Sequence, residues 1–219
     1  MSQLTFKFPF KTKYYEQDFF VSNNNFSAYR LIESWPKWPG KWVNVFGESG
    51  SGKTHLSKIL EKKINKIKIV DAENINNKII SNLINYECLI IDNYLENIEE
   101  NLFYSILNQS RQCNNFFIIN SLTALNKKLF KLNDLQSRIN SFVFIGIDLP
   151  TDDLLKVIIT KTFSDKQISL SPKISDYIIK NVERSYAKIS KFLKDVDELS
   201  LSSGKSININ LIKKILKNE

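Results

Sequence analysis

The glycines of this chain are few and clustered, since three of the six lie between positions 47 and 52. The cluster follows an apolar segment at 41–46 that predicts a buried strand, and a helical pattern runs from about 53 to 64. A strand, a glycine-rich turn and a helix in direct succession are typical of α/β folds, in which helices cover a parallel sheet. The glycine cluster thus favours that class of architecture over all-helical and all-strand folds.

The rest of the chain repeats this alternation as far as residue 149. Further strands are expected at 67–70, 88–91, 116–119 and 142–147, and further helices at 74–86, 98–111 and 126–139. Apart from Lys68, these strands are apolar, as in parallel sheets with both faces covered. From Pro150 the pattern is helical only, with helices expected at 151–164, 172–181, 184–201 and 208–217. We therefore predict an extended arm at 1–14, an α/β domain at 15–149 and a small all-helical domain at 150–219.

Residues 47–54 match the phosphate-binding pattern G-x-x-x-x-G-K-[ST]. Glycine permits backbone conformations that turn successive N–H groups inward around a phosphate, and the N-terminal end of the following helix adds positive charge. Lys53 is expected to reach the β- and γ-phosphate oxygens, and the Thr54 hydroxyl to ligate Mg²⁺. The pattern predicts a site for ATP or ADP that is built from Gly47, Glu48, Ser49, Gly50, Ser51, Gly52, Lys53, Thr54 and His55.

Two further strand ends carry polar side chains. Asp92 follows the apolar segment 88–91, where a carboxylate is expected to hold Mg²⁺ through water; the alternative is an ordinary turn residue. Asn93 stands where ATPases of this architecture usually place an acid, and an amide cannot accept a proton, so we expect weak intrinsic hydrolysis at most. Asn120 follows the strand at 116–119 and is expected to sense a γ-phosphate, or else to be a turn residue.

The chain has four arginines, at positions 30, 111, 138 and 184, among 31 basic residues. In a chain that otherwise uses lysine, they are candidates for bidentate recognition of phosphate or carboxylate. Arg138 precedes the last expected strand, from where a guanidinium could reach a phosphate in a neighbouring subunit. Arg184 opens the third C-terminal helix and could reach a phosphate in its own subunit. The alternative for both is surface ion pairing.

Charge and rare residues exclude several function classes. The net charge of +8 is spread evenly, with +4 before Pro150 and +4 from there on, which favours a lysine-solvated surface and only indirect or weak DNA contact. One histidine and two distant cysteines cannot form a zinc site, and they leave little basis for histidine-dependent hydrolysis. The few cysteines indicate a reducing, cytoplasmic compartment, and no stretch approaches the 18 apolar residues of a membrane span.

The sequence G-x-x-G-x-G-K-T-H-L at 47–56 resembles the AAA+ module of the bacterial replication initiator DnaA. Residues 134–138 resemble that family's arginine-finger segment, and the helical C-terminal part resembles its lid. The resemblance implies a P-loop AAA+ fold, with a parallel sheet flanked by helices and a small helical lid, that binds ATP or ADP with Mg²⁺. The family's second sensor arginine aligns with Ala187, which leaves the preference between ATP and ADP open; Arg184 is a candidate substitute.

The Asp92-Asn93 pair and the N-terminus resemble those of Hda-like regulators, which inactivate DnaA. Residues 3–8 match the Q-L-x-L-x-L style of peptide with which such proteins bind the sliding clamp, the β subunit of DNA polymerase III. Gln3 would supply polar anchoring, and Leu4, Phe6 and Phe8 would enter an apolar groove. The alternative is a strand buried against its own domain.

The resemblance implies a regulatory role rather than rapid turnover. Arg138 would be presented to ATP bound by DnaA and would stimulate its hydrolysis, which negatively regulates the initiation of chromosomal replication. The arm would dock the protein on a DNA-loaded clamp, and a homodimer is a further candidate assembly. The alternative function is an autonomous DnaA-like or helicase-loader ATPase that acts on DNA.

Overall fold

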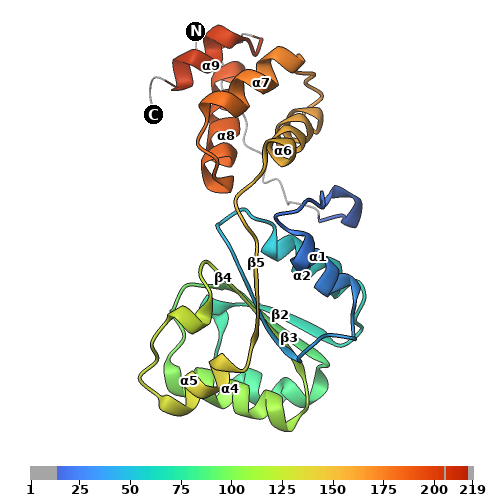
Figure 1. Ribbon diagram of the computed structural model, residues 1–219, viewed down its shortest axis with the longest axis vertical. Helices are drawn as coiled ribbons and strands as arrows, with labels where there is room; N and C mark the ends of the chain where they lie inside the picture. Colours follow the sequence, from blue (N-terminus) through green and yellow to red (C-terminus); the bar gives the residue numbers. More distant parts are fainter. Residues whose placement is uncertain (1–13, 205, 217–219) are drawn as a thin grey trace. The chain divides into compact units, whose positions relative to one another are not determined.

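The computed structural model describes residues 14–204 and 206–216, and within them one parallel sheet has five strands in the order β2-β3-β4-β1-β5 (Figure 1). The chain divides into two compact units, Tyr14–Asp148, which holds the sheet, and a second unit that begins at Leu149. Because the strands are parallel, the residues that end them all lie at one edge of the sheet. The strands are β1 (Trp42–Phe46), β2 (Ile67–Asp71), β3 (Cys88–Tyr94), β4 (Phe116–Ser121) and β5 (Val143–Gly146).

Helices cover both faces of this sheet, as Figure 1 shows. On one face, α1 (Phe26–Glu33) and α2 (Lys53–Glu61) pack against the side chain of Ile90. On the other, α4 (Glu100–Gln112) and α5 (Asn133–Asn140) pack against Leu89 and Ile91. Successive strand side chains point to opposite faces, so a strand buried on both faces must be apolar at every position. The predicted α/β class, a parallel sheet flanked by helices, is confirmed.

The single helix predicted at 74–86 is wrong. The segment consists of the short helix α3 (Lys78–Asn82) between two 3₁₀ turns, η2 (Ala72–Asn74) and η3 (Leu83–Asn85). Ile75 is extended, and the Asn76 side chain accepts a hydrogen bond from the Lys78 N–H at 3.0 Å. Asparagine competes for backbone hydrogen bonds in this way, which interrupts a helix that the apolar periodicity alone favours.

The helix predicted at 126–139 is also wrong in its first half. A 3₁₀ turn, η4 (Leu125–Lys127), comes first, and α5 begins only at Asn133. The Glu100 carboxylate accepts hydrogen bonds from the Lys131 and Leu132 N–H groups at 3.2 and 3.0 Å. The two N–H groups therefore bond to a side chain of α4 instead of to carbonyl oxygens of a helix of their own. No pattern in the local sequence indicates this.

The strands β3 and β4 are longer than predicted. Asp92 lies inside β3 and Asn120 inside β4, rather than in the turns that follow. A short 3₁₀ turn, η1 (Glu16–Asp18), precedes α1 near the start of the described chain. The side chains of Asp92 and Asn120 are therefore carried by the backbone of the sheet, which fixes their positions more firmly than a turn would.

Helices are the only regular elements in the described part of the second unit, as predicted. Its helices are α6 (Asp152–Ser164), α7 (Pro172–Asn181), α8 (Tyr186–Ser203) and α9 (Ile209–Leu216). Their apolar faces form a separate core that includes Phe163 and Phe192. Arg184 precedes α8 and does not open it, which corrects the predicted start. Across 14–204 and 206–216, every helix is too short or too polar to cross a membrane.

Candidate nucleotide-binding site

The loop at 47–54 joins β1 to α2 and takes a conformation that glycine makes accessible. Gly50 and Gly52 have φ values of +83° and +99°, in the region that residues with a Cβ rarely adopt. A Cβ at Gly52 would lie 2.9 Å from Phe19 Cε2 and would clash with the ring. The local sequence thus folds into a tight turn that leads directly into the N-terminus of α2.

Lys53 lies across this turn, with its side chain half-buried. Its Nζ donates hydrogen bonds to the carbonyl oxygens of Gly47 and Glu48 at 2.7 and 2.8 Å. Burial lowers the pKa of the Lys53 ammonium below its ordinary value of 10.5, while the charges of Asp92 and Glu48 act in the opposite direction. A cation that loses hydration at a helix N-terminus is well suited to bind an anionic group.

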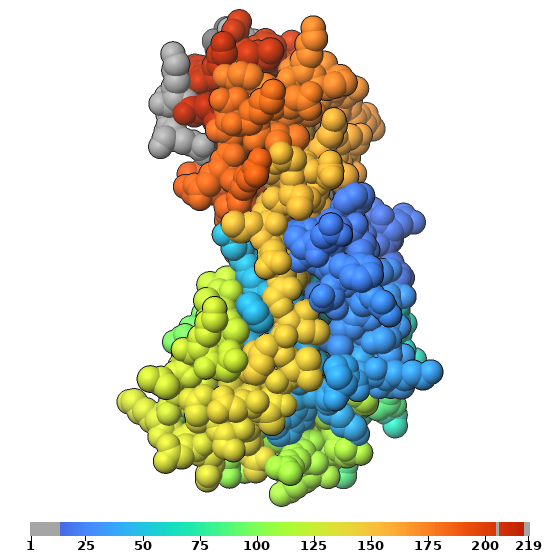
Figure 2. Space-filling view, viewed as in Figure 1, coloured from blue at the N-terminus to red at the C-terminus, as the bar shows by residue number. Residues whose placement is uncertain are grey.

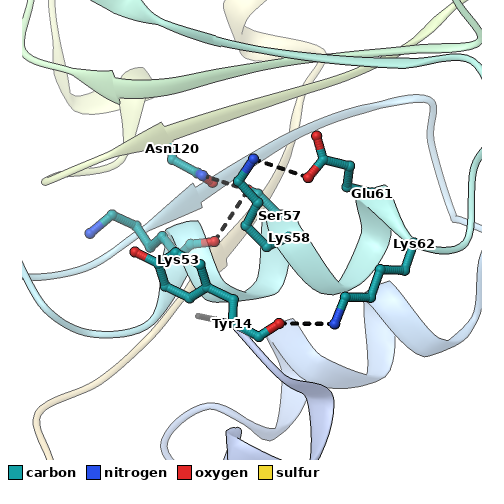
Figure 3. A network of polar contacts seen from close by, with 7 residues as sticks. All are labelled: Tyr14, Lys53, Ser57, Lys58, Glu61, Lys62 and Asn120. Carbon is teal, nitrogen blue, oxygen red and sulfur yellow. Dashed lines mark hydrogen bonds and ion pairs between the residues drawn. The ribbon is translucent and has the colours of Figure 1, made fainter. Parts of the chain in front are cut away.

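A buried polar network lies behind the loop. Asn120 Nδ2 donates to Asp92 Oδ1 at 2.9 Å and to Ser57 Oγ at 2.8 Å. Ser57 Oγ in turn donates to the Lys53 carbonyl at 3.2 Å, and Figure 3 shows this chain of contacts running from Asn120 to the loop. The exposed fractions of Asp92 and Asn120 are only 6% and 1%. The network therefore joins β3, β4 and α2 at the edge of the sheet where the loop lies.

A cavity of about 850 Å³ opens beside the loop, which is within the range of small-molecule sites. Seven of the predicted binding residues line it: Ser49, Gly50, Gly52, Lys53, Thr54, His55 and Asn120. Gly47, Glu48, Ser51 and Asp92 are not among its lining residues. Asp92 Oδ1 accepts hydrogen bonds from Asn120 and from the Asn93 N–H, and neither bond uses Oδ2.

His55 holds a neighbouring segment rather than pointing only at the cavity. Its Nε2 lies 2.7 Å from the carbonyl oxygen of Tyr15, so Nε2 carries the proton, and its ring meets that of Tyr14 edge-on at 5.3 Å. Lys62 also donates to the Tyr14 carbonyl at 2.9 Å, as Figure 3 shows. Tyr14 itself lines the cavity. The segment at 14–19 is thus fixed to α2 at the cavity wall.

Sequence reasoning missed Tyr14, Asp71 and Glu73, which also line the cavity. Asp71 ends β2 and pairs in register with Asp92, so its place at the carboxyl end of a parallel strand was a signal that could have revealed it. Nothing in the local sequence singles out Tyr14, because its place depends on contacts with a helix about forty residues further on.

Asn93 is held by Asp71 across the two strand ends. It has a φ of +55°, and its Nδ2 donates to Asp71 Oδ2 at 2.7 Å. The other oxygen of Asp71 accepts a hydrogen bond from the Glu73 N–H at 3.0 Å. The amide at position 93 therefore acts as a donor to an acid on the neighbouring strand.

Changing Asn93→Asp should destabilise this unit by about 0.5 to 1 kcal/mol, because a second carboxylate would replace the donor. The double variant with Asp71→Asn should recover most of the loss, since donor and acceptor are then exchanged. Denaturant unfolding followed by tryptophan fluorescence measures the change in the free energy of unfolding, because all three tryptophans lie at 35–42, within the first unit. A double variant no more stable than Asn93→Asp alone would contradict the pairing.

Of the remaining predicted residues, Arg138 does not line this cavity, and Arg184 belongs to the second unit. Arg138 is half-buried in the last turn of α5, and its guanidinium lies over the Tyr104 ring at 5.4 Å. Arg184 makes an exposed ion pair with Asp152 at 2.9 Å, within the second unit. This is the surface pairing that was the alternative to a phosphate contact. The predicted clamp-binding residues, Gln3, Leu4, Phe6 and Phe8, lie outside the described residues.

Comparison with known proteins finds replication initiators among the chains similar to this one. No protein-family profile matches. The chromosomal replication initiator protein DnaA of Buchnera aphidicola subsp. Baizongia pistaciae is 29% identical over 248 residues, which cover 99% of this chain and 53% of that protein. The chain spans about half the length of the curated relatives it matches.

The solved structures show the same likeness. Domain III of DnaA from Thermotoga maritima superposes with a TM-score of 0.76 at 17% identity, covering 96% of this chain and 98% of that one. A replication initiator DnaA bound to AMPPCP and single-stranded DNA gives a TM-score of 0.69 at 19% identity, covering 89% and 67%. The chain therefore has the AAA+ fold of DnaA domain III and is similar in sequence to replication initiators.

Proposed function

We propose that this chain is a nucleotide-bound AAA+ regulator that stimulates ATP hydrolysis by a DnaA-type initiator and so restrains the initiation of replication. The observation that carries the proposal is that its two candidate phosphate-binding cations lie apart. Lys53 lines the cavity beside the glycine loop, whereas Arg138 lines a different cavity, between α4 and α5. One cation would bind the chain's own nucleotide, and the other is available to a nucleotide that another protein holds.

The residues beside the loop fit ATP or ADP with Mg²⁺. Lys53 and the N-terminus of α2 would bind the phosphates, Thr54 would ligate the metal ion, and Asp92 Oδ2 would reach it through water. When bound, the nucleotide would supply the negative charge that holds Lys53 and the loop in a single arrangement. The similarity to an AMPPCP-bound DnaA supports this assignment. Asn93 provides no proton acceptor, so the chain's own hydrolysis would be slow.

In the partner's site, water attacks the γ-phosphorus and the bond to the bridging oxygen breaks, which gives ADP and inorganic phosphate. Negative charge develops on the phosphoryl oxygens during this step. The Arg138 guanidinium would stabilise that charge from outside the partner's own site, as arginine fingers do. Arg138 lies on α5, just before the edge strand β5, which is a suitable place for contact with another subunit.

Recruitment by the sliding clamp rests on residues 3–8, where a glutamine and alternating apolar side chains suit an extended peptide in a groove. Both cysteines are free thiols, which supports a place of action in the reducing cytoplasm. A homodimer remains part of the proposal, because Arg138 could serve a second copy in the same manner.

The test is initiator ATP hydrolysis measured with and without a DNA-loaded clamp. Replacing Gln3, Leu4 and Phe6 by Ala should remove the stimulation that depends on the clamp and should leave nucleotide binding intact, because the arm supplies the docking contacts. A matched variant with Lys11 and Lys13 changed to Ala controls for altering the arm. Undiminished clamp binding by the first variant would contradict the assignment.

The second candidate function is an autonomous DNA-dependent ATPase, favoured by the similarity to a DnaA bound to single-stranded DNA. It requires DNA binding that weakens steeply with salt and rapid ATP turnover by the isolated chain. The amide at position 93 argues against rapid turnover. Weak DNA binding together with clamp-dependent stimulation of an initiator would exclude this candidate.

A further inference from the structure

A second cavity, of about 310 Å³, lies between α4 and α5, and the proposed function uses only one of its residues. The lining residues are Tyr104, Arg111, Asp134, Ser137, Arg138 and Ser141. Tyr104 and Arg111 are seven residues apart on α4, so they lie on the same face of that helix, two turns from one another. Two of the chain's four arginines therefore line one small cavity.

The Arg138 side chain is held by an aromatic ring, and no acidic side chain among the described residues pairs with its charge. Its guanidinium lies over the Tyr104 ring at 5.4 Å, and its Nε is buried with no hydrogen-bond partner among the residues the structure describes. Asp134 stands one helical turn earlier on α5, yet no ion pair joins the two within that part of the chain. An aromatic ring orients a guanidinium without cancelling its charge. The side chain as a whole is only half-buried, so its positive charge, which no acidic side chain among the described residues balances, can attract an anion from outside.

Arg111 adds a second positive charge at the same place. It lies in the last turn of α4, is exposed, and forms no ion pair or side-chain hydrogen bond among the described residues. Arg184 differs, because it is paired with Asp152. Arg111 and Ser141 also line an adjoining cavity of about 290 Å³, which Lys41 lines as well.

The charge of this region favours phosphate over carboxylate. Arg111, Arg138 and Lys41 bring three positive charges, and Asp134 is the single acidic residue that lines either cavity. One carboxylate would leave most of this charge unbalanced, whereas the terminal phosphates of a nucleotide carry several negative charges. Two guanidinium groups can each bind phosphate oxygens in a bidentate manner. Residues around 125–145, in yellow, form a continuous part of the surface in the space-filling view, so a second protein can approach α5 (Figure 2).

We propose that this cavity receives the terminal phosphates of a nucleoside triphosphate held by a neighbouring AAA+ subunit, with Arg111 as a second phosphate-binding residue beside Arg138. The inference rests on the proposed function of Arg138 and extends it to a site with two guanidinium groups. The triphosphate can belong to an initiator or to a second copy of this chain.

The test compares Arg111→Ala, Arg111→Lys and Arg138→Ala in the stimulation of an ATP-loaded DnaA-type initiator, with the maximal rate and the half-saturating concentration measured separately. Arg111→Ala should lower the maximal rate about 10- to 100-fold, because a charge-assisted bond to the reacting phosphate is lost. Arg111→Lys should recover part of that loss. Arg30→Ala, at an arginine on α1, is the matched control and should leave both quantities unchanged.

The outcomes separate this inference from the function on which it rests. If Arg138→Ala abolishes stimulation while Arg111→Ala has the parent rate, the second phosphate contact is overturned and the proposed function stands. If neither variant changes the rate, both the second phosphate contact and the proposed function are overturned. A lowered melting temperature with an unchanged rate would show that Arg111 only stabilises the end of α4, which also overturns the inference. Arg111→Gln, which keeps most of the side chain's packing, serves if the alanine variant does not fold.

A second arm of the experiment identifies the source of the triphosphate. The chain's own ATP hydrolysis is measured against its concentration in the absence of the initiator. A concentration-dependent rise that Arg111→Ala removes assigns the phosphates to a second copy. An effect of Arg111→Ala confined to the initiator reaction assigns them to the initiator, and an effect in neither reaction overturns the site.

Discussion

Replacing Arg138 by Ala should reduce the stimulation of initiator ATP hydrolysis by about 10³-fold or more, the range found when an arginine finger is lost. The reason is that the guanidinium is the group proposed to meet the charge that develops on the transferred phosphoryl oxygens. Nucleotide binding by the chain itself should not change, because Arg138 does not line the cavity beside the glycine loop. Single-turnover hydrolysis of initiator-bound ATP is the measurement.

Two variants show whether the loss is specific. Arg138→Lys keeps the charge but not the planar fork, so it should recover little of the rate. Tyr104→Phe keeps the ring on which the guanidinium lies, so this variant should retain most of the stimulated rate. Stimulation that persists with Arg138→Ala would reject the finger role. A large loss of stability in that variant would instead mean that its contact with Tyr104 serves folding.

Replacing Lys53 by Ala should weaken binding of ATP and ADP about 10- to 100-fold, because the change removes a charge-assisted contact to the phosphates. Stability should change by no more than about 1 kcal/mol, since the loss of two hydrogen bonds to carbonyl oxygens is offset by the removal of a partly buried charge. Lys58→Ala is the matched control on the same helix, because Lys58 only pairs with Glu61 at the surface. Titration calorimetry measures the affinity.

The pH dependence of nucleotide binding gives a further check on Lys53. Burial favours the neutral form and holds the pKa below 10.5, whereas a bound phosphate favours the charged form. Affinity should therefore be highest below this lowered pKa and should fall as the pH rises through it. The fall should be absent from Lys53→Ala. An unchanged affinity in that variant at neutral pH would show that the cavity does not bind phosphate through Lys53.

The sheet could be predicted because its signal is local. The run Leu89-Ile90-Ile91 is apolar at every position, and such a strand must be covered on both faces. The errors arise where distant groups decide the backbone. Glu100 accepts the hydrogen bonds that end the non-helical stretch before α5, and it lies about thirty residues away in the sequence. Periodicity carries no information about such a partner.

The candidate site divides in the same way. The loop at 47–54 and Asp92 could be found because a motif or a strand end marks them. Tyr104 carries no such mark, and its relation to Arg138 depends on how α4 packs against α5. Asp71 is intermediate, since its strand-end position was visible in the sequence but its hydrogen bond to Asn93 was not. The sequence thus marks the candidate residues whose position depends on local geometry, and it does not mark those whose position depends on how distant elements pack.

The contact between Gly52 and Phe19 bears on how variation at this loop is interpreted. A side chain at position 52 meets both an unfavourable φ of +99° and an aromatic ring 2.9 Å away. In a library of variants selected only for folding, glycine would therefore persist there even if no variant ever met a nucleotide. Tolerance to substitution at Lys53 and Thr54 is the informative comparison, because the unfavourable φ and the close ring contact concern position 52. Intolerance at these two positions, in a selection that requires function, would report on phosphate binding rather than on the architecture of the turn.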